Sequence, residues 1–404
     1  MKVLVLNCGS SSIKYQFINT DGEDVLAIGA VERIGMSSAV LTHTPKGKEK
    51  IKIVGEILDH TLAIEYVIAV LLSPNHGVIK DKAEIDAVGH RVVHGGEDFT
   101  GSVLITDRVM SVLKDNIELA PLHNPPNIKG IQAAKAHLPK TPQIGVFDTS
   151  FHANMPPHAF LYGIPYELYR RYKIRRYGFH GTSHRYVSQK AAMMLDRPFE
   201  ELKIITIHLG NGASIAAIDK GVSIDTSMGF TPLEGLLMGT RSGDLDPSII
   251  TYVMGKEGLD IRDMNALLNK HSGLLGVSGE SSDMRELEEA VKAGDKRAIN
   301  AFDLFNYRIK KYIGSYIAAL GGLDALVFTG GIGENSIEVR KAVCSNMEYL
   351  GIELDLDKNS NADGMIDLST KKSKVRVLKI PTNEELVIAL DTEKIVSEQI
   401  KVEE

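Results

Sequence analysis

The chain has 404 residues, of which 43% are hydrophobic and 24% are charged. This length and composition are typical of a globular protein with two or three domains. The formal net charge of -6 argues against a general nucleic-acid binder, which needs a basic surface. No stretch of 18 apolar residues occurs, so we expect no membrane span.

Two features bear on the compartment. The apolar run that follows Met1 ends at Asn7, which is too short for the core of a secretory signal peptide. The two cysteines, Cys8 and Cys344, lie far apart and match no metal-ligand spacing. We therefore expect a cytoplasmic protein with reduced thiols.

The N-terminal stretch predicts a meander of three antiparallel strands. Three short β-branched runs are joined by Gly-containing turns and span residues 2–7, 13–18 and 25–31. Asn7 and Lys14 flank the first turn, residues 9–12. This turn is either a serine-rich hairpin or a turn whose backbone N–H groups hold phosphate oxygens. It is not a Walker loop, because a strand and not a helix follows it.

Arg91 lies inside the next predicted strand. A lysine-rich exposed hairpin at residues 46–52 and a core helix at residues 61–72 come first, and residues 85–93 then form an apolar strand. An unpaired guanidinium in such a strand would be costly. Arg91 is therefore either half of a core ion pair or an anion-binding arginine.

Asp148 directly follows another short strand, residues 143–147. A helix from about residue 127 to residue 137, started by the prolines before it, leads into this strand. Ligands bind at the carboxyl ends of strands in open α/β sheets. Asp148 is thus either a ligand-facing carboxylate or a turn cap.

Residues 166–180 are basic and rich in aromatic side chains. We expect a solvated or interface face there, not an RNA site, because the whole chain is acidic. His180 is the last residue of this patch and lies between two glycines, where its side chain can donate a hydrogen bond to a developing anion. Thr182 or Ser183 is expected to be the N-cap of the following helix. His180 and His184 lie four residues apart, but no glutamate follows His180 as in zinc proteases.

Residues 203–244 repeat the N-terminal pattern. Two apolar runs at 204–209 and 213–218, and a third from Val222, predict a second meander. Gly210 in its first turn lies 201 residues after Gly9, which indicates two related α/β domains. Arg241, flanked by glycines and hydroxyls, suits a phosphate or carboxylate.

The last third alternates between helix and strand. A core helix over residues 302–320 ends at a glycine pair, and a strand at 325–328 leads into the glycine-rich turn 329–335 and a helix from Ser336. No GxGxxG pattern is present, so this turn favours a nucleotide wall over a nicotinamide site. Glu384, before the final helix, is either a cap or a carboxylate beside a metal.

Ten motifs in order carry a resemblance over essentially the whole chain. They are NCGSSSIK, GHRVVHGG, APLHNPPN, FDTSFH, GFHGTSH, HLGNGAS, MGTRSGD, SGESSDMR, FTGGIGEN and PTNEE. This set closely resembles the acetokinase family of the acetate and sugar kinase/Hsp70/actin superfamily. The resemblance implies an α/β fold of two duplicated actin/ribonuclease H-like domains, each a mixed β-sheet flanked by helices, with an interdomain cleft. The implied N-terminal domain comprises residues 1–150 and a returning helix at 385–404, and the second, nucleotide-binding domain comprises residues 151–384.

The resemblance also implies roles for individual residues. The catalytic set is Asp148 as acid/base, His180 and Arg241 as stabilisers of the transition state, and Arg91 as the group that holds the carboxylate. Asn7 and Glu384 serve a Mg²⁺ site, with Mn²⁺ as the alternative metal. The acyl pocket consists of Val93, Leu122, Phe179 and Pro232. The nucleotide contacts are Lys14, His208, Leu209, Gly210, Asn211, Gly212, Asp283, Met284, Arg285, Gly331, Ile332, Gly333, Glu334 and Asn335.

The implied reaction is the reversible, Mg-dependent transfer of the γ-phosphoryl group of ATP to acetate, giving acetyl phosphate and ADP. Acetate is ionised at pH 7 and attacks in line without a general base, so we expect Asp148 to act on the metal or on the Arg and His geometry. A propionate-preferring kinase is the alternative, and an ATP-gated actin/Hsp70-like binding protein is a rival of another class. The partners implied are acetate, acetyl phosphate, ATP and ADP, with a homodimer as the family expectation and neither nucleic acid nor membrane.

Overall fold

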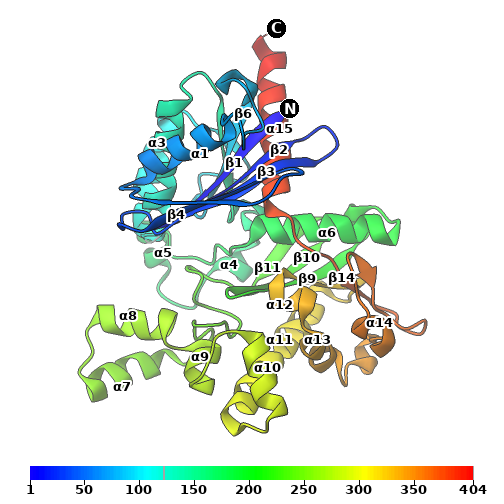
Figure 1. Cartoon of the computed structure of the whole chain (residues 1–404). Coiled ribbons are helices and arrows are strands. Elements are labelled where there is room, and N and C mark those ends of the chain that lie inside the picture. Colours follow the sequence, from blue (N-terminus) through cyan, green and yellow to red (C-terminus); the bar gives the residue numbers. More distant parts are fainter. Residues whose placement is uncertain (122, 404) are drawn as a thin grey trace. The chain divides into compact units, whose positions relative to one another are not determined.

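The computed structural model describes residues 1–121 and 123–403 and divides into two compact units. The first unit comprises residues 1–153 and the C-terminal segment from Asn383, and the second unit comprises Asn154–Thr382. One mixed β-sheet forms the centre of each unit (Figure 1). In the part of the chain that is described, no helix has both the length and the apolar character needed to cross a membrane.

The sheet of the first unit has eight strands in the order β5-β4-β3-β2-β1-β6-β8-β7. Its strands are β1 Lys2–Cys8, β2 Ser12–Asn19, β3 Asp24–Glu32, β4 Ala39–Pro45, β5 Ile51–Gly55, β6 Ala87–Val92, β7 Val103–Leu104 and β8 Gln143–Phe147. Its helices are α1 His60–Leu71, α2 Asp107–Asp115, α3 Asn124–His137 and α15 Glu384–Glu403. Helices α1 and α3 pack together, and α15 runs along β1, β6 and β8 (Figure 1).

The sheet of the second unit has six strands in the order β11-β10-β9-β12-β14-β13. Its strands are β9 Lys203–Leu209, β10 Ala213–Asp219, β11 Val222–Thr226, β12 Ala325–Thr329, β13 Ile366–Asp367 and β14 Arg376–Lys379. Its helices are α4 Pro157–Phe160, α5 Tyr166–Tyr172, α6 Gly181–Leu195, α7 Pro247–Glu257, α8 Ile261–Lys270, α9 Gly273–Ser278, α10 Met284–Lys292, α11 Lys296–Leu320, α12 Gly330–Asn335, α13 Ile337–Cys344 and α14 Leu356–Ser360.

The two sheets share a five-stranded core, which confirms the predicted duplication. In each, an antiparallel meander is followed by two parallel strands: β3-β2-β1-β6-β8 in the first unit and β11-β10-β9-β12-β14 in the second. The first turns differ in length. Cys8 pairs with Ile13 across the first turn, whereas Leu209 pairs with Ala213, so the first turn holds one residue more.

Helix α11 shows why the long apolar period of the sequence forms a core helix. Its buried stripe includes Phe305, Ile309, Ile313 and Leu320, and it ends at Gly321, whose positive φ of 66° lets the chain leave the helix. The helix begins six residues before the predicted start at residue 302. Its N-cap is Asp295, whose carboxylate accepts a hydrogen bond from the Ala298 N–H at 2.7 Å.

Two local predictions are wrong, and that of a solvated basic patch holds only for Arg170, Arg171 and Lys173, which are exposed. Helix α6 begins at Gly181 with His180 before it at φ 55°, so Thr182 and Ser183 lie inside the first turn and are not caps. The basic patch is not uniformly solvated, because the Arg175 guanidinium packs 3.8 Å from the Phe160 ring centroid and Arg176 pairs with Glu234. The glycine-rich turn after β12 is itself helical, as α12.

Asn127 joins the ends of two strands in the first unit. Its side chain accepts a hydrogen bond from the Val93 N–H at 3.1 Å and donates to the Cys8 carbonyl at 2.8 Å. Asn127 is 3% exposed, so both backbone groups depend on it and not on water.

We expect Asn127→Ala to lower the free energy of unfolding by about 1–3 kcal/mol, because it leaves buried polar groups unpaired. Urea denaturation followed by circular dichroism measures this. Asn361→Ala is the control, since its amide hydrogen bond to the Asp357 carbonyl is exposed. Equal midpoints for the two variants would contradict the role given to Asn127.

Candidate functional site

Asn7, Arg91 and Asp148 meet where the parallel strands β1, β6 and β8 end. Arg91 Nε and Nη2 donate to the two oxygens of Asp148, at 3.0 and 2.6 Å, and Nη1 lies 3.5 Å from Asn7 Oδ1. The carboxyl ends of these strands lie at one edge of the sheet, which is why residues far apart in sequence converge. Arg91 therefore forms an ion pair, the first of the two alternatives considered for it.

The burial of this pair determines its electrostatics. Asp148 is 1% exposed and Arg91 is 24% exposed. Burial raises the pKa of Asp148, and the charge and hydrogen bonds of Arg91 oppose that rise. Burial alone would lower the pKa of Arg91, but Asp148 and then Glu384 more than compensate, so Arg91 stays charged.

The charge of Glu384 thus belongs to the same cluster. Glu384 is the first residue of α15, and the side chain of Asn383 accepts a hydrogen bond from the Leu386 N–H at 3.1 Å. Asn383 therefore fills the capping role that the sequence left open for Glu384. Oxygens of Asn7 and Asp148 thus contact Arg91, and the charge of Glu384 acts on the same guanidinium.

Lys14 and Val93, two other predicted residues of the first unit, lie close to Asn7 and Arg91 along the strands. Lys14 is exposed and faces Asn7 across the β1–β2 hairpin. Val93 follows the last residue of β6 and is 8% exposed. Leu122 lies outside the described residues.

In the second unit, His180 and Arg241 approach the turn between β9 and β10. A β-carbon added at Gly212 would lie 3.4 Å from His180 Nε2 and 3.5 Å from Arg241 Nη1, so both side chains reach this glycine closely. The rings of His180 and His208 stack with centroids 4.3 Å apart. Phe179, which directly precedes His180 in the sequence, is 2% exposed.

Arg241 has no carboxylate partner among the residues described. Its Nη1 donates to the Pro232 carbonyl at 3.2 Å and contacts the Met238 sulfur at 3.8 Å. Burial lowers the pKa of Arg241, because nothing nearby compensates the desolvated charge. A partly buried cation of this kind is suited to an anionic ligand.

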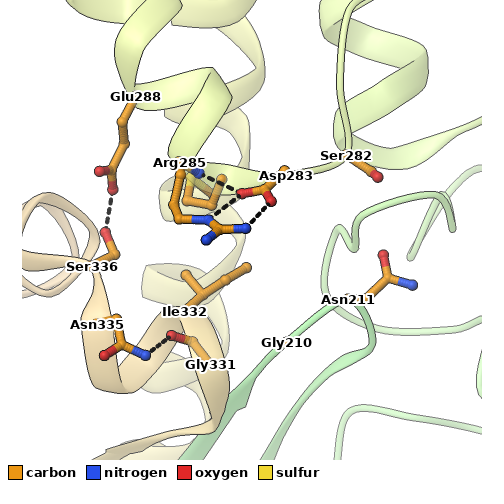
Figure 2. A pocket seen from close by; sticks show the side chains of 11 residues that line it. Gly210, Asn211, Ser282, Asp283, Arg285, Glu288, Gly331, Ile332, Asn335 and Ser336 are labelled. Carbon is orange, nitrogen blue, oxygen red and sulfur yellow. Dashed lines mark hydrogen bonds and ion pairs between the residues drawn. The ribbon is translucent and has the colours of Figure 1, made fainter. Parts of the chain in front are cut away.

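A cavity of about 630 Å³ opens beside the same turn (Figure 2). Its lining residues are Gly210, Asn211, Ser282, Asp283, Met284, Arg285, Glu288, Gly331, Ile332, Asn335 and Ser336. Asp283 and Arg285 form a bidentate pair with distances of 3.1 and 2.6 Å, and Asn335 donates to the Gly331 carbonyl at 2.8 Å. The apolar side chains of Ile332 and Met284 among polar lining residues suit a flat heteroaromatic ring that carries a polar tail.

Eight of the predicted nucleotide contacts line this cavity: Gly210, Asn211, Asp283, Met284, Arg285, Gly331, Ile332 and Asn335. Glu334 does not line it, since its carboxylate accepts hydrogen bonds from the Gly330 and Thr382 N–H groups, at 2.9 and 3.1 Å. His208, Leu209, Gly212 and Gly333 are also not among the lining residues, and Lys14 belongs to the first unit.

Three lining residues were missed by the sequence analysis: Ser282, Glu288 and Ser336. Glu288 lies one helical turn after Arg285 on α10 and is hydrogen-bonded to Ser336, which caps α13. Glu288 could have been predicted from its spacing of three residues from Arg285 on a helix, which places the two side chains on the same face.

Comparison with known proteins gives a consistent result. The model of the Acetokinase family matches residues 2–390. The acetate kinase of Natranaerobius thermophilus is 59% identical over 389 residues, covering 96% of this chain and 98% of the relative. The acetate kinase structure from Porphyromonas gingivalis superposes with a TM-score of 0.95 at 50% identity, covering 98% of this chain and 99% of that one. A propionate kinase structure from Francisella tularensis gives 0.91 at 43% identity, with the same coverage.

We expect Asp148→Ala to lower the free energy of unfolding by about 3–5 kcal/mol, because it strands the buried charge of Arg91. Chemical denaturation measures this loss. Asp24→Ala is the control, since Asp24 pairs with the exposed Lys46 at 2.6 Å and its loss is expected to cost at most about 1 kcal/mol. A similar loss in both variants would show that the buried pair has no special weight.

Proposed function

Because this chain belongs to the acetokinase family, we propose that it transfers the γ-phosphoryl group of ATP to acetate, giving acetyl phosphate and ADP, and runs the reverse reaction as well. The chain is a kinase whose acceptor is a carboxyl group. The structural observation that carries the proposal is Arg241, a partly buried guanidinium with no carboxylate partner among the described residues, beside the close turn at Gly212.

We assign the nucleotide to the second unit, which is then the nucleotide-binding domain. The cavity beside Gly210 is large enough for a nucleoside, and Met284 and Ile332 offer apolar contact to a purine. The N–H groups of the turn at Gly210–Gly212 are suited to phosphate oxygens, because no side chain blocks their approach. The first unit, with its returning helix α15, is the acceptor domain in this proposal.

Arg91 holds the carboxylate in this assignment. Its ion pair with Asp148 fixes the plane of the guanidinium, which matches the fork geometry of a second carboxylate or a phosphate. The acyl pocket that the family resemblance implies comprises Val93, Leu122, Phe179 and Pro232, residue types whose apolar side chains suit a methyl group.

The chemistry then depends on charge and position. Acetate needs no base, so the protein must place the carboxylate oxygen in line and neutralise charge on the transferring group. Arg241 and His180 donate to that group, and Arg91 orients the acid. Asp148 acts through Arg91 in this scheme, because its two oxygens are both engaged by that side chain.

Asn7 and Glu384 are the proposed residues for Mg²⁺. The cluster around Arg91 contains the hard oxygen donors that Mg²⁺ prefers, and Mg²⁺ in kinases needs only one or two protein carboxylates besides the phosphates. When bound, the ion neutralises phosphate charge. In the described part of the chain no group of three or more His, Cys, Asp or Glu side chains forms a ready-made metal site, which fits a metal brought with the nucleotide.

We further propose a cytoplasmic location and a homodimer. Both cysteines are free and buried, which suits a reducing compartment. The homodimer rests on the family resemblance.

The decisive experiment traps acyl phosphate with hydroxylamine while acetate, propionate and butyrate are supplied in parallel with ATP and Mg²⁺. We expect the highest kcat/KM with acetate, because the proposed pocket suits a methyl group. Each added methylene of the acid changes its binding free energy by about 1–3 kcal/mol, so the size of the pocket decides the preference. Preference for propionate would favour the alternative seen in the similar Francisella tularensis protein. No hydroxamate with any of the acids would favour an ATP-gated binding protein.

We expect Arg241→Ala to lower kcat by about 10²–10³, as for other donors that stabilise transition-state charge. Steady-state kinetics of hydroxamate formation measures this. Arg262→Ala is the control, because Arg262 is 94% exposed. A rate near wild type would remove Arg241 from the mechanism.

A further inference from the structure

A buried chain of hydrogen bonds leads from the sheet of the second unit to His180. Thr206 Oγ1 lies 2.7 Å from His184 Nδ1, His184 Nε2 lies 2.7 Å from Ser214 Oγ, and Ser214 Oγ lies 2.9 Å from His180 Nδ1. Thr206, His184 and Ser214 are fully buried, with 0% exposure. We call these three residues and His180 the Thr206 chain.

The fold explains why these side chains meet. Thr206 on β9 and Ser214 on the paired strand β10 point to one face of the sheet, because Ser214 faces His208 and residues two apart share a face. Helix α6 packs against β9 and carries His184 on its second turn. His180 stands directly before that helix.

The positions of the hydrogens follow from counting donors and acceptors. The Thr206 hydroxyl has one partner among the described residues, His184 Nδ1. If Thr206 accepted a hydrogen bond from that nitrogen, its own buried hydrogen would have no acceptor, so Thr206 donates. Neutral His184 then carries its hydrogen on Nε2 and donates it to Ser214.

The hydrogen at the His180 end of the Thr206 chain is placed in the same way. The Ser214 hydroxyl accepts from His184, and its only other described partner is His180 Nδ1, so Ser214 donates to that nitrogen. A neutral His180 must therefore carry its hydrogen on Nε2. This is the nitrogen that lies near Gly212 and Arg241.

We propose that Thr206, His184 and Ser214 are positioning residues that hold His180 as the neutral Nε2–H tautomer, so that it presents a hydrogen-bond donor to the transferring phosphoryl group without taking up a proton. This inference deepens the proposed function and rests on it for the identity of the group that receives the hydrogen bond. The direction of the Thr206 chain rests on geometry alone.

A charged His180 would conflict with the chain. An imidazolium donates from both nitrogens, so Ser214 would accept from His180 and would have to donate to His184. His184 would then donate to Thr206, and the buried hydroxyl hydrogen of Thr206 would have no acceptor. The ring of His208 stacks on that of His180 at 4.3 Å. The guanidinium of Arg241 reaches the same glycine, Gly212, as His180 Nε2, and its positive charge disfavours a second cation there.

The neighbouring histidine shows a contrast. His208 Nδ1 contacts Ser183 Oγ at 2.7 Å, and Ser183 contacts Thr382 Oγ1 at 2.9 Å. Thr382 is partly exposed, so water can accept its hydrogen and nothing fixes the direction of that chain. Of these two hydrogen-bond chains, the Thr206 chain is the one that ends on a fully buried hydroxyl.

The first test reads the tautomer directly. Long-range ¹H–¹⁵N spectra of the full chain, without substrates at pH 7, distinguish the nitrogens of the 13 histidines, and His180→Asn assigns the His180 signals. We expect hydrogen on Nε2 only. Hydrogen on Nδ1, or on both nitrogens, would overturn the proposal. Because no reaction is involved, this result stands apart from any failure of the kinase assay.

The second test breaks the chain by substitution. We expect Ser214→Ala and Thr206→Val to give mixed His180 tautomers and to lower kcat about tenfold and several-fold, respectively, with the KM for ATP within about twofold of wild type. Thr206→Ser, which keeps the hydroxyl, should restore both readouts.

The control for these variants is Thr226→Val. Thr226 is buried in the same sheet, and its hydroxyl donates to the Ile215 carbonyl at 3.2 Å, so it takes no part in the Thr206 chain. We expect the wild-type tautomer and kcat. A pure Nε2–H tautomer with full kcat in Thr206→Val, or an equal loss in Thr226→Val, would show that Thr206 does not set the direction.

Discussion

The ion pair between Arg91 and Asp148 is the interaction on which the polar edge of the first unit depends. Two charges are removed from water there, and the bidentate geometry, with Asp148 at 1% exposure, is what makes this tolerable. The pair fixes the guanidinium relative to Asn7 and brings the charge of Glu384 into the same cluster. Without this carboxylate, the desolvation of the Arg91 charge at the end of the strand would not be offset.

The second unit also contains a desolvated arginine, but no carboxylate pairs with it in the described part of the chain. Arg241 is also partly buried, yet its described partners are a carbonyl and a sulfur, so no described carboxylate compensates its charge. One arginine is thus held rigid by a carboxylate, and the other retains its affinity for an anion. This division fits a reaction in which one group orients a carboxylate and another meets the negative charge of a phosphoryl group.

Much of the fold could be predicted because its elements repeat and have clear periods. The two meanders, the strands ending at Asp148 and Thr329, and the helix ending at Gly321 all follow from apolar patterning and glycine turns. The failures came from tertiary contacts. Ser183 is a strong capping type, but its hydroxyl contacts His208 instead, and Arg175 is buried because an aromatic ring lies beneath it.

The site shows the same limit. Arg91 and Asp148 were found separately, but that they contact each other depends on the parallel pairing of β6 with β8, which no local pattern reports. The Thr206 chain was likewise invisible, because Thr206 and Ser214 look like ordinary strand residues until α6 places His184 between them. Residues that act through a neighbour carry little signal of their own in one sequence.

The unequal length of the two hairpin tips has a consequence for how the halves diverged. Cys8–Ile13 and Leu209–Ala213 are the last cross-strand pairs before tips of four and three residues, so a residue can be gained or lost inside a tip without changing which side chains share a face. The same change inside either strand would turn every later side chain, including Lys14, to the opposite face of the sheet. The difference in length could therefore accumulate only at the tips. The halves share an architecture, but their tips are no longer interchangeable parts.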